Sequence, residues 1–169
     1  MYNEFRGFVK GGKLTAVSQY NHLSVFPELL GDAQCGLCSK RFPCSCDVTE
    51  VSQTLLPAKE LGAKLSAFFY ARCAPKLAGK FDDYIIDFAI DSAGQVLIIE
   101  LNPFLETTDS CLFSWQKERA LLEDGGIGDV PVVRHVPVVR LRTAVERGVK
   151  SMLAAEWRTA LEQQQAAML

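Results

Sequence analysis

The segment 84–103 constrains the fold of this chain more than any other. Its two halves, 84–91 and 95–101, alternate between apolar and polar or small side chains, as strands with one buried face do. The Ala-Gly pair at 93–94 predicts a two-residue turn, so the halves form an antiparallel β-hairpin. The strand pairs that this turn implies are Asp91 with Val96, Ala89 with Ile98 and Asp87 with Glu100.

The two faces of this hairpin differ in character. Successive side chains of a strand point to opposite faces, so Asp87, Glu100 and Asn102 share one face. Two carboxylates directly across a hairpin repel each other, and Mg²⁺, which takes carboxylate oxygens together with phosphate oxygens, would relieve that repulsion. A solvent-exposed polar face without a ligand explains the same pattern. We expect the other face to belong to the core, since it carries Ile86, Phe88, Ile90, Leu97, Ile99 and Leu101.

A second hairpin is predicted at the N-terminus. The runs 4–10 and 13–19 alternate on either side of the Gly-Gly pair at 11–12. Residues 50–73 then show helical spacing of apolar side chains, and we expect Pro75 to end that helix.

The order of the remaining elements predicts the fold class. A short helix through Arg119, capped by Thr108 or Asp109, follows the hairpin of 84–103. One or two short strands within 131–141 carry two prolines, which favours the edge of a sheet. Together these elements predict an α+β fold, an antiparallel sheet with helices packed on one face.

Composition limits the function classes. The 169 residues suit about one domain, and a net charge of −2 provides no bulk attraction for nucleic acid or an anionic membrane. Glu4 and Arg6 interrupt the N-terminus, so we expect no secretory signal. No run of about 18 apolar residues is present. We therefore expect a cytoplasmic protein with no nucleic-acid or membrane partner.

A set of short motifs stands in a distinctive order. They are Glu4-Phe5-Arg6 with Phe8-Val9-Lys10, Ser18-Gln19, Glu100-x-Asn102-Pro103-Phe104 preceded by Asp87, and Thr108-Asp109-Ser110 with Leu112-Phe113-Ser114-Trp115. Over residues 3–20 and 83–115 the chain resembles the cell division cycle protein 123 family of the ATP-grasp superfamily. Members of that family bind Mg-ATP and the gamma subunit of translation initiation factor 2, and they promote assembly of that factor.

The resemblance implies a domain plan. Residues 1–142 would form an ATP-grasp half-domain, similar to the C-terminal subdomain, with a Cys-rich insertion at 31–47, and 143–169 a C-terminal helix. Family members hold nucleotide between two subdomains, so we expect one wall of the nucleotide site here. The chain departs from the family at Tyr20, where Arg is usual, and at Glu100, where Asp is usual.

The resemblance also implies a site. Asp87, Glu100 and Asn102 would be the ligands of Mg²⁺, and Arg6 would contact a phosphate of ATP. Lys10 is a second candidate for a nucleotide contact, with a solvated surface charge as its other explanation. The expected function is an assembly chaperone for translation initiation factor 2 that binds Mg-ATP, with the gamma subunit as partner. The alternatives are an ATP-grasp ligase or phosphotransferase, and an interaction domain that binds no nucleotide and is held together by zinc at the Cys-rich loop.

The cysteines divide into two groups. Four lie in the loop 31–47 in the spacing of a structural zinc site, although an insertion that is merely rich in cysteine explains them too. Cys73 and Cys111 lie in apolar stretches and are expected in the core. Because neither His22 nor His135 lies in a local motif, the sequence does not favour a Cys–His nucleophile. The four candidate zinc ligands are Cys35, Cys38, Cys44 and Cys46.

Overall fold

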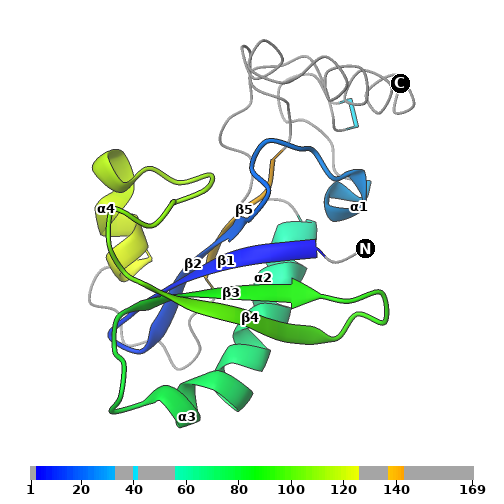
Figure 1. Cartoon of the computed structure of the whole chain (residues 1–169). Coiled ribbons are helices and arrows are strands. Elements are labelled where there is room, and N and C mark those ends of the chain that lie inside the picture. The colour runs from blue at the N-terminus through cyan, green and yellow to red at the C-terminus, as the bar shows by residue number, and fades with distance from the viewer. Residues whose placement is uncertain (1–2, 33–39, 42–55, 126–136, 143–169) are drawn as a thin grey trace.

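The computed structural model describes residues 3–32, 40–41, 56–125 and 137–142, which form one mixed β-sheet with helices (Figure 1). The order of the strands in the sheet is β4-β3-β1-β2-β5. Strands β1 to β4 pair antiparallel, and β5 pairs parallel with β2 at the edge. The predicted α+β class is confirmed, but the sheet is not wholly antiparallel as expected, because β5 pairs parallel with β2. The strands are β1 (Asn3–Lys10), β2 (Lys13–Gln19), β3 (Tyr84–Ile90), β4 (Val96–Pro103) and β5 (Val138–Arg140).

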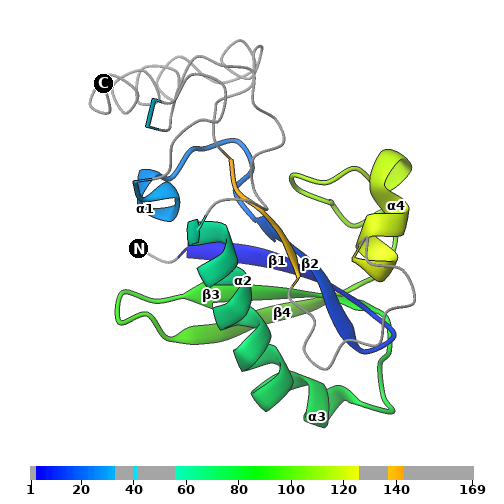
Figure 2. The ribbon, with the colours of Figure 1, turned by 180° about the vertical axis from the view of Figure 1, so that it is seen from behind.

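Helices pack on both faces of the sheet. Helix α2 (Leu56–Phe68) crosses one face, with the π-helix η1 (Phe69–Cys73) and α3 (Ala74–Leu77) continuing its course, and α1 (Pro27–Leu30) is short. Helix α4 (Trp115–Asp124) packs against the opposite face, as the views from the two sides show (Figures 1 and 2). The expectation that all helices share one face is therefore wrong for α4.

Helices pack on both faces because the strands carry buried apolar side chains on both faces. Phe5 and Phe8 on β1 point to opposite faces, and both are fully buried. The sheet therefore has a core on each side, in place of one apolar and one wet face. The α2 side includes Phe5, Val9, Leu14, Val17, Leu61, Leu65, Phe69, Tyr84, Ile86 and Phe88. The α4 side contains Phe8, Ala16, Ile85, Phe113, Trp115 and Leu122.

The N-terminal hairpin has the predicted turn. Lys10 pairs with Lys13, and Gly11 and Gly12 have φ angles of 55° and 72°. A turn with positive φ at both central residues matches the twist of the strands, and glycine adopts it without strain.

The hairpin of β3 and β4 keeps the central predicted pair and changes the others. Asp87 lies opposite Glu100, as expected, but Ile90 pairs with Val96 and Phe88 with Ile98. The register shifts at a β-bulge next to Asp87. Asp91 Oδ1 accepts hydrogen bonds from the backbone N–H groups of Ala93 and Gln95, so the connection is longer than the predicted two-residue turn.

The apolar side chains of β4 are less buried than predicted. Leu97, Ile98, Ile99 and Leu101 are between 42% and 48% exposed. The prediction that both strands bury a complete apolar face is therefore wrong for β4. The reason is the position of β4 at one edge of the sheet, since within the described residues α2 covers the central strands more fully.

Helix boundaries also depart from expectation. Pro75 lies in the first turn of α3 and does not end the helical segment. The backbone N–H of Ala74 bonds to the carbonyl of Phe69, a π-type turn that widens the helix just before the proline ring needs space. Ser114, rather than Thr108 or Asp109, caps α4, because its hydroxyl accepts from the N–H of Lys117.

Some predictions fall outside the described residues. They are the four loop cysteines, His135, the proline-rich start of the segment 131–141 and the helix over 143–169. Of that segment, β5 confirms the expected edge strand. Among the described residues, no helix combines the length and hydrophobicity needed to cross a bilayer.

Candidate functional site

A buried ion pair lies at the centre of the candidate site. Arg6 on β1 and Asp87 on β3 are direct cross-strand partners. Arg6 Nε donates to Asp87 Oδ1 at 2.9 Å, and Nη2 donates to Oδ2 at 2.7 Å. Both residues are at most 5% exposed. The planar guanidinium and the carboxylate therefore meet in the two-point geometry that orients both groups.

A hydrogen-bond network extends from this ion pair to Glu100 on the next strand, β4. Asn102 Nδ2 donates to Asp87 Oδ2 at 3.2 Å and to Glu100 Oε1 at 3.0 Å. One amide thus bridges two carboxylates that lie opposite each other in the sheet. The structure brings together Arg6 and the three predicted magnesium ligands, and we call these four residues the acidic group.

Burial and hydrogen bonds set the charges of this group. Burial raises the pKa of Asp87; the hydrogen bonds and charge of Arg6 oppose that rise, and Glu100 adds to it. The hydrogen bond to Asp87 raises the pKa of Arg6, so the guanidinium keeps its charge. The hydrogen bond from Asn102 lowers the pKa of Glu100. Of the two carboxylates, Glu100 is the accessible one, since Asp87 is 1% exposed.

The guanidinium of Arg6 also makes contacts beyond Asp87. Its Nη1 donates to the backbone carbonyl of Asp109 at 2.8 Å, and the ring of Tyr20 lies 4.8 Å from its central carbon. Each of its three nitrogens therefore has a protein acceptor. Contact between Arg6 and a phosphate stays a prediction.

Lys10 lies apart from the acidic group. It is four residues along β1 from Arg6, roughly 13 Å in an extended strand. Its Nζ forms an ion pair with Asp83 at 2.6 Å and lies 5.4 Å from the ring centre of Phe104. A role for Lys10 in nucleotide binding also stays a prediction.

The donor set of the acidic group suits a hard cation. Two carboxylates and one amide oxygen are ligands that Mg²⁺ accepts. Glu100 is exposed, whereas Asp87 shares its oxygens with Arg6 and Asn102. Rotation of the Asn102 amide would turn its oxygen toward the site and free Asp87 Oδ2 of one donor. The residues present therefore fit such an ion.

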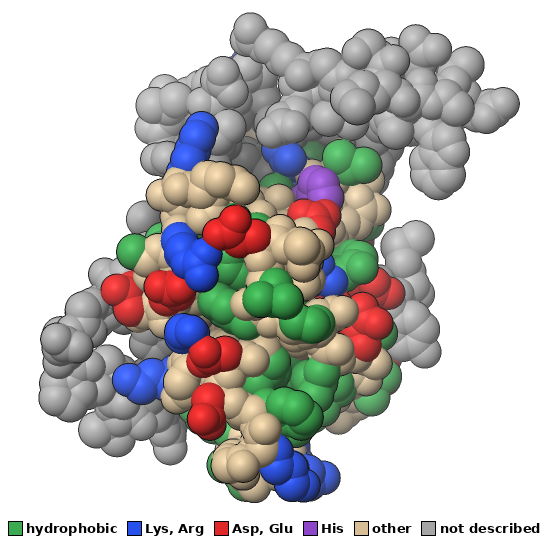
Figure 3. Space-filling model, turned by 60° about the vertical axis from the view of Figure 1, so that its left-hand side comes forward, with side chains coloured by type: hydrophobic (Ala, Val, Ile, Leu, Met, Phe, Trp, Pro, Cys, Tyr) green, Lys and Arg blue, Asp and Glu red, His purple; other side chains and the backbone are tan. Residues whose placement is uncertain are grey.

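An apolar groove lies on the other side of the sheet. It has a volume of about 480 Å³ and runs between α2, η1 and α3 on one side and β4 on the other. Phe68, Leu77 and Ile98 line it, with Arg72 and Lys76 among its polar residues. Figure 3 shows one face of the molecule, on which hydrophobic side chains gather and charged side chains lie around them. The groove and the acidic group are on opposite faces, so they do not form one pocket.

Some contacts of the site are not predictable from local sequence. Tyr20 stands where the family usually has Arg, and its ring contacts Arg6. The carbonyl of Asp109 reaches Arg6 over 103 residues of sequence separation. His22 Nδ1 lies 3.9 Å from Asp109 Oδ2, and the motif that contains Asp109 does not indicate a histidine neighbour. Folding alone brings these residues together.

Fold and site together define an α+β protein with an acidic, oxygen-rich group across three adjacent strands. The chain belongs to the D123 family, whose sequence profile matches residues 46–158. It is 27% identical over 121 residues to a "Translation initiation factor eIF2 assembly protein" of Xenopus laevis, covering 72% of this chain and 28% of that protein. The protein of the same name from Candida albicans is 28% identical over 112 residues, covering 58% and 32%.

Two further comparisons complete this picture. The protein of the same name from Danio rerio is 47% identical over 36 residues, 21% of this chain and 10% of that protein. The solved structure of Cdc123 from Schizosaccharomyces pombe aligns with a TM-score of 0.49 at 20% identity, covering 84% of this chain and 41% of that one. The chain spans about a third or less of the length of the named relatives that it matches.

Proposed function

We propose that this chain acts in assembly of eIF2 and binds Mg-ATP through the acidic group. One observation carries the nucleotide part: Asp87 and Glu100 lie opposite each other, and the amide of Asn102 contacts both. Membership of the D123 family, with relatives named eIF2 assembly proteins, supports the assembly part. The proposed partner is the gamma subunit of eIF2, met in the cytoplasm.

The exposure of each residue in the acidic group indicates its role in binding Mg²⁺. Glu100 presents its carboxylate to solvent, and Asn102 next to it can offer an amide oxygen. Asp87 would contribute the one oxygen that Arg6 and Asn102 share. Bound Mg²⁺ would neutralise the charge of the ATP phosphates and bridge them to these oxygens. Arg6 holds Asp87 in place for this role, because its two-point contact fixes the carboxylate plane.

Calorimetry with Mg-ATP tests the nucleotide part. We expect binding by the full chain and at least about a tenfold weaker affinity in Glu100→Gln, which keeps the shape and removes the charge. Glu60→Gln is the matched control, since Glu60 is an exposed residue of α2. Absence of binding by the folded chain, or equal affinity in Glu100→Gln, would contradict the role of the acidic group.

A pull-down with the separate eIF2 subunits tests the assembly part. We expect the gamma subunit to be retained and ATP to be consumed slowly whether or not an acceptor is present. Release of ADP or AMP that depends on an added acceptor would instead favour the ligase or phosphotransferase alternative. Failure to retain the gamma subunit while Mg-ATP still binds would overturn the assembly role alone.

A further inference from the structure

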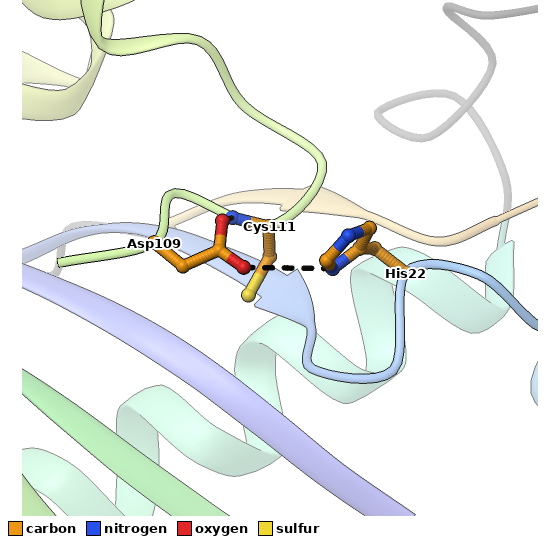
Figure 4. A group of neighbouring side chains, drawn as sticks. All are labelled: His22, Asp109 and Cys111. Carbon is orange, nitrogen blue, oxygen red and sulfur yellow. Dashed lines mark hydrogen bonds and ion pairs between the residues drawn. The ribbon is translucent and has the colours of Figure 1, made fainter.

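Three chemically reactive side chains from two loops meet beside the acidic group. His22 follows β2, whereas Asp109 and Cys111 lie in the loop between β4 and α4 (Figure 4). One imidazole nitrogen, one carboxylate oxygen and the Cys111 sulfur all lie within 4.8 Å of one another. We call these three residues the His-Asp-Cys group.

The loop after β4 presents two of these atoms by its backbone conformation. Asp109 Oδ1 accepts from the backbone N–H of Cys111 at 2.9 Å, which leaves Oδ2 to face His22. Cys111 has a φ angle of 56°, a value that L-residues other than Asn and Asp seldom adopt. The N–H of Leu112 donates to Ser18 Oγ, and Arg6 donates to the Asp109 carbonyl. These bonds fix the turn against β1 and β2.

The loop after β2 presents the third atom. Gln19 Nε2 donates to the carbonyls of Asn21 and Ser24, each at 2.6 Å, and Arg142 Nε donates to the carbonyl of His22 at 2.7 Å. His22 Nδ1 is buried and has no hydrogen-bond partner among the residues that the structure describes. It lies 3.9 Å from Asp109 Oδ2, beyond hydrogen-bond distance. A buried nitrogen of this kind needs a partner, which a bound ion or a water molecule can supply.

We propose that the His-Asp-Cys group binds Zn²⁺ or a similar borderline divalent cation. Thiolate and imidazole are donors that select such metals over Mg²⁺ and Ca²⁺, and a carboxylate completes a three-ligand set. Three protein ligands leave one coordination position for water or another small ligand. This site is distinct from the acidic group, whose donors are oxygen atoms.

The distances agree with this assignment. Ligand atoms around tetrahedral Zn²⁺ lie about 3.3–3.8 Å apart, given metal–ligand distances near 2.0–2.3 Å. The three donor atoms lie within 4.8 Å of one another, so they need to approach by at most about 1.5 Å, which side-chain rotation provides. Burial raises the pKa of the Cys111 thiol to about 12, so the metal displaces the thiol proton on binding.

Such a cation would connect the loop after β2 with the loop before α4. It would hold Asp109, and Asp109 holds Arg6 through its carbonyl. The metal ion would thus link the loop after β2 to the loop before α4, next to the acidic group. If the metal binds the folded chain and not the unfolded one, the free energy of unfolding rises with the logarithm of the metal concentration above Kd.

Cobalt substitution tests the proposal in the full chain. The parent variant carries serine in place of Cys35, Cys38, Cys44 and Cys46, so that only Cys73 and Cys111 remain as thiols. We expect Co²⁺ to produce a thiolate-to-cobalt charge-transfer band, and Zn²⁺ to displace it, as the stability order of these metals requires. His22→Ala and Asp109→Asn should each weaken the metal affinity more than about tenfold.

Two matched substitutions assign the band. Cys73→Ser should retain it, because Cys73 lies in the core on the α2 side, and Cys111→Ser should abolish it. If Cys111→Ser does not fold, retention in Cys73→Ser still identifies Cys111 as the ligand. A folded parent without the band, or a band lost in Cys73→Ser, would overturn the proposal. Neither result bears on Mg-ATP binding, which calorimetry follows independently.

Discussion

The guanidinium of Arg6 and the carboxylate of Asp87 form a two-point ion pair between adjacent strands, with contacts of 2.9 Å and 2.7 Å. Both side chains are almost completely removed from solvent. Arg6 reaches further, to the carbonyl of Asp109, and so joins the hairpin of β3 and β4 to the loop before α4. The acidic group is thereby part of the structural framework as well as the candidate binding site.

Removing one partner of this pair should destabilise the fold strongly. Asp87→Asn leaves a buried guanidinium without its counter-charge, and we expect the free energy of unfolding to fall by about 3–5 kcal/mol. Chemical denaturation followed by circular dichroism measures this. Replacing both partners with apolar residues, Arg6→Met with Asp87→Leu, should recover most of the loss, since no buried charge remains.

The exposed ion pair of the same strand is the control. Lys10 and Asp83 are each more than a third exposed, so Lys10→Met should change stability by about 1 kcal/mol or less. A loss in Asp87→Asn as small as that of Lys10→Met would contradict the structural role of the Arg6–Asp87 pair.

Gly7 is required by close packing within the sheet. A Cβ atom at this position would lie 2.8 Å from the Phe88 ring and 2.9 Å from a Leu14 methyl group. We expect Gly7→Ala to lower the free energy of unfolding by about 1–3 kcal/mol, because the surrounding core has to shift. Thermal and chemical denaturation of the variant measure the change.

A second substitution separates packing from backbone effects. Phe88→Leu removes the ring atoms that the new methyl group would meet. If overpacking is the cause, the double variant will lose less stability than the sum of the two single losses. Strict additivity would show that the side chain of Phe88 is not the obstacle.

The central pair of the acidic group was predictable because it depends only on strand alternation. Asp87 and Glu100 remain opposite each other even though the connection between β3 and β4 differs from expectation. Alternation cannot detect the bulge that absorbs one residue, and the Asp91 side chain selects a longer turn than the Ala-Gly pair suggests. The register near the turn was therefore wrong, while the register at the site was right.

Local sequence patterns do not predict contacts between residues that are far apart in the sequence. The parallel pairing of β5 with β2 joins Ala16 with Val138, and no local signal marks a partner so distant. The same holds for the placement of α4, which follows from Phe8 being buried on the face opposite Phe5. Local patterns also do not place His22 beside Cys111, because only the folded loops bring them together.

The N-cap of α4 can be tested by mutation, because the structure assigns it to Ser114 and the sequence predicted Thr108 or Asp109. Ser114 Oγ accepts from the N–H of Lys117, and Glu118 Oε2 accepts from the N–H of Ser114. We expect Ser114→Ala to cost about 1 kcal/mol of stability, as loss of an N-cap usually does. Ser92→Ala, in the exposed turn after β3, is the control. An equal effect of both variants would show that Ser114 contributes little as a cap.

Tyr84 should couple stability to alkaline pH. It is 5% exposed, and burial raises its pKa from the ordinary value of 10 to about 12. Between these values the unfolded chain loses the phenol proton and the folded chain keeps it, so stability falls as pH rises through that window. Below pH 10 the contribution is fully present. Cys73 adds a separate loss, because burial raises its pKa to about 11.

Tyr84→Phe isolates the tyrosine contribution, since phenylalanine has no proton to lose. We expect the free energy of unfolding of this variant to decline less steeply between pH 10 and 12 than that of the unmodified chain. Denaturation curves at a series of pH values measure the slope. Cys73→Ser should instead flatten the decline from pH 9 to 11. An unchanged slope above pH 10 in Tyr84→Phe would mean that the phenol ionises as readily in the folded chain as in the unfolded one.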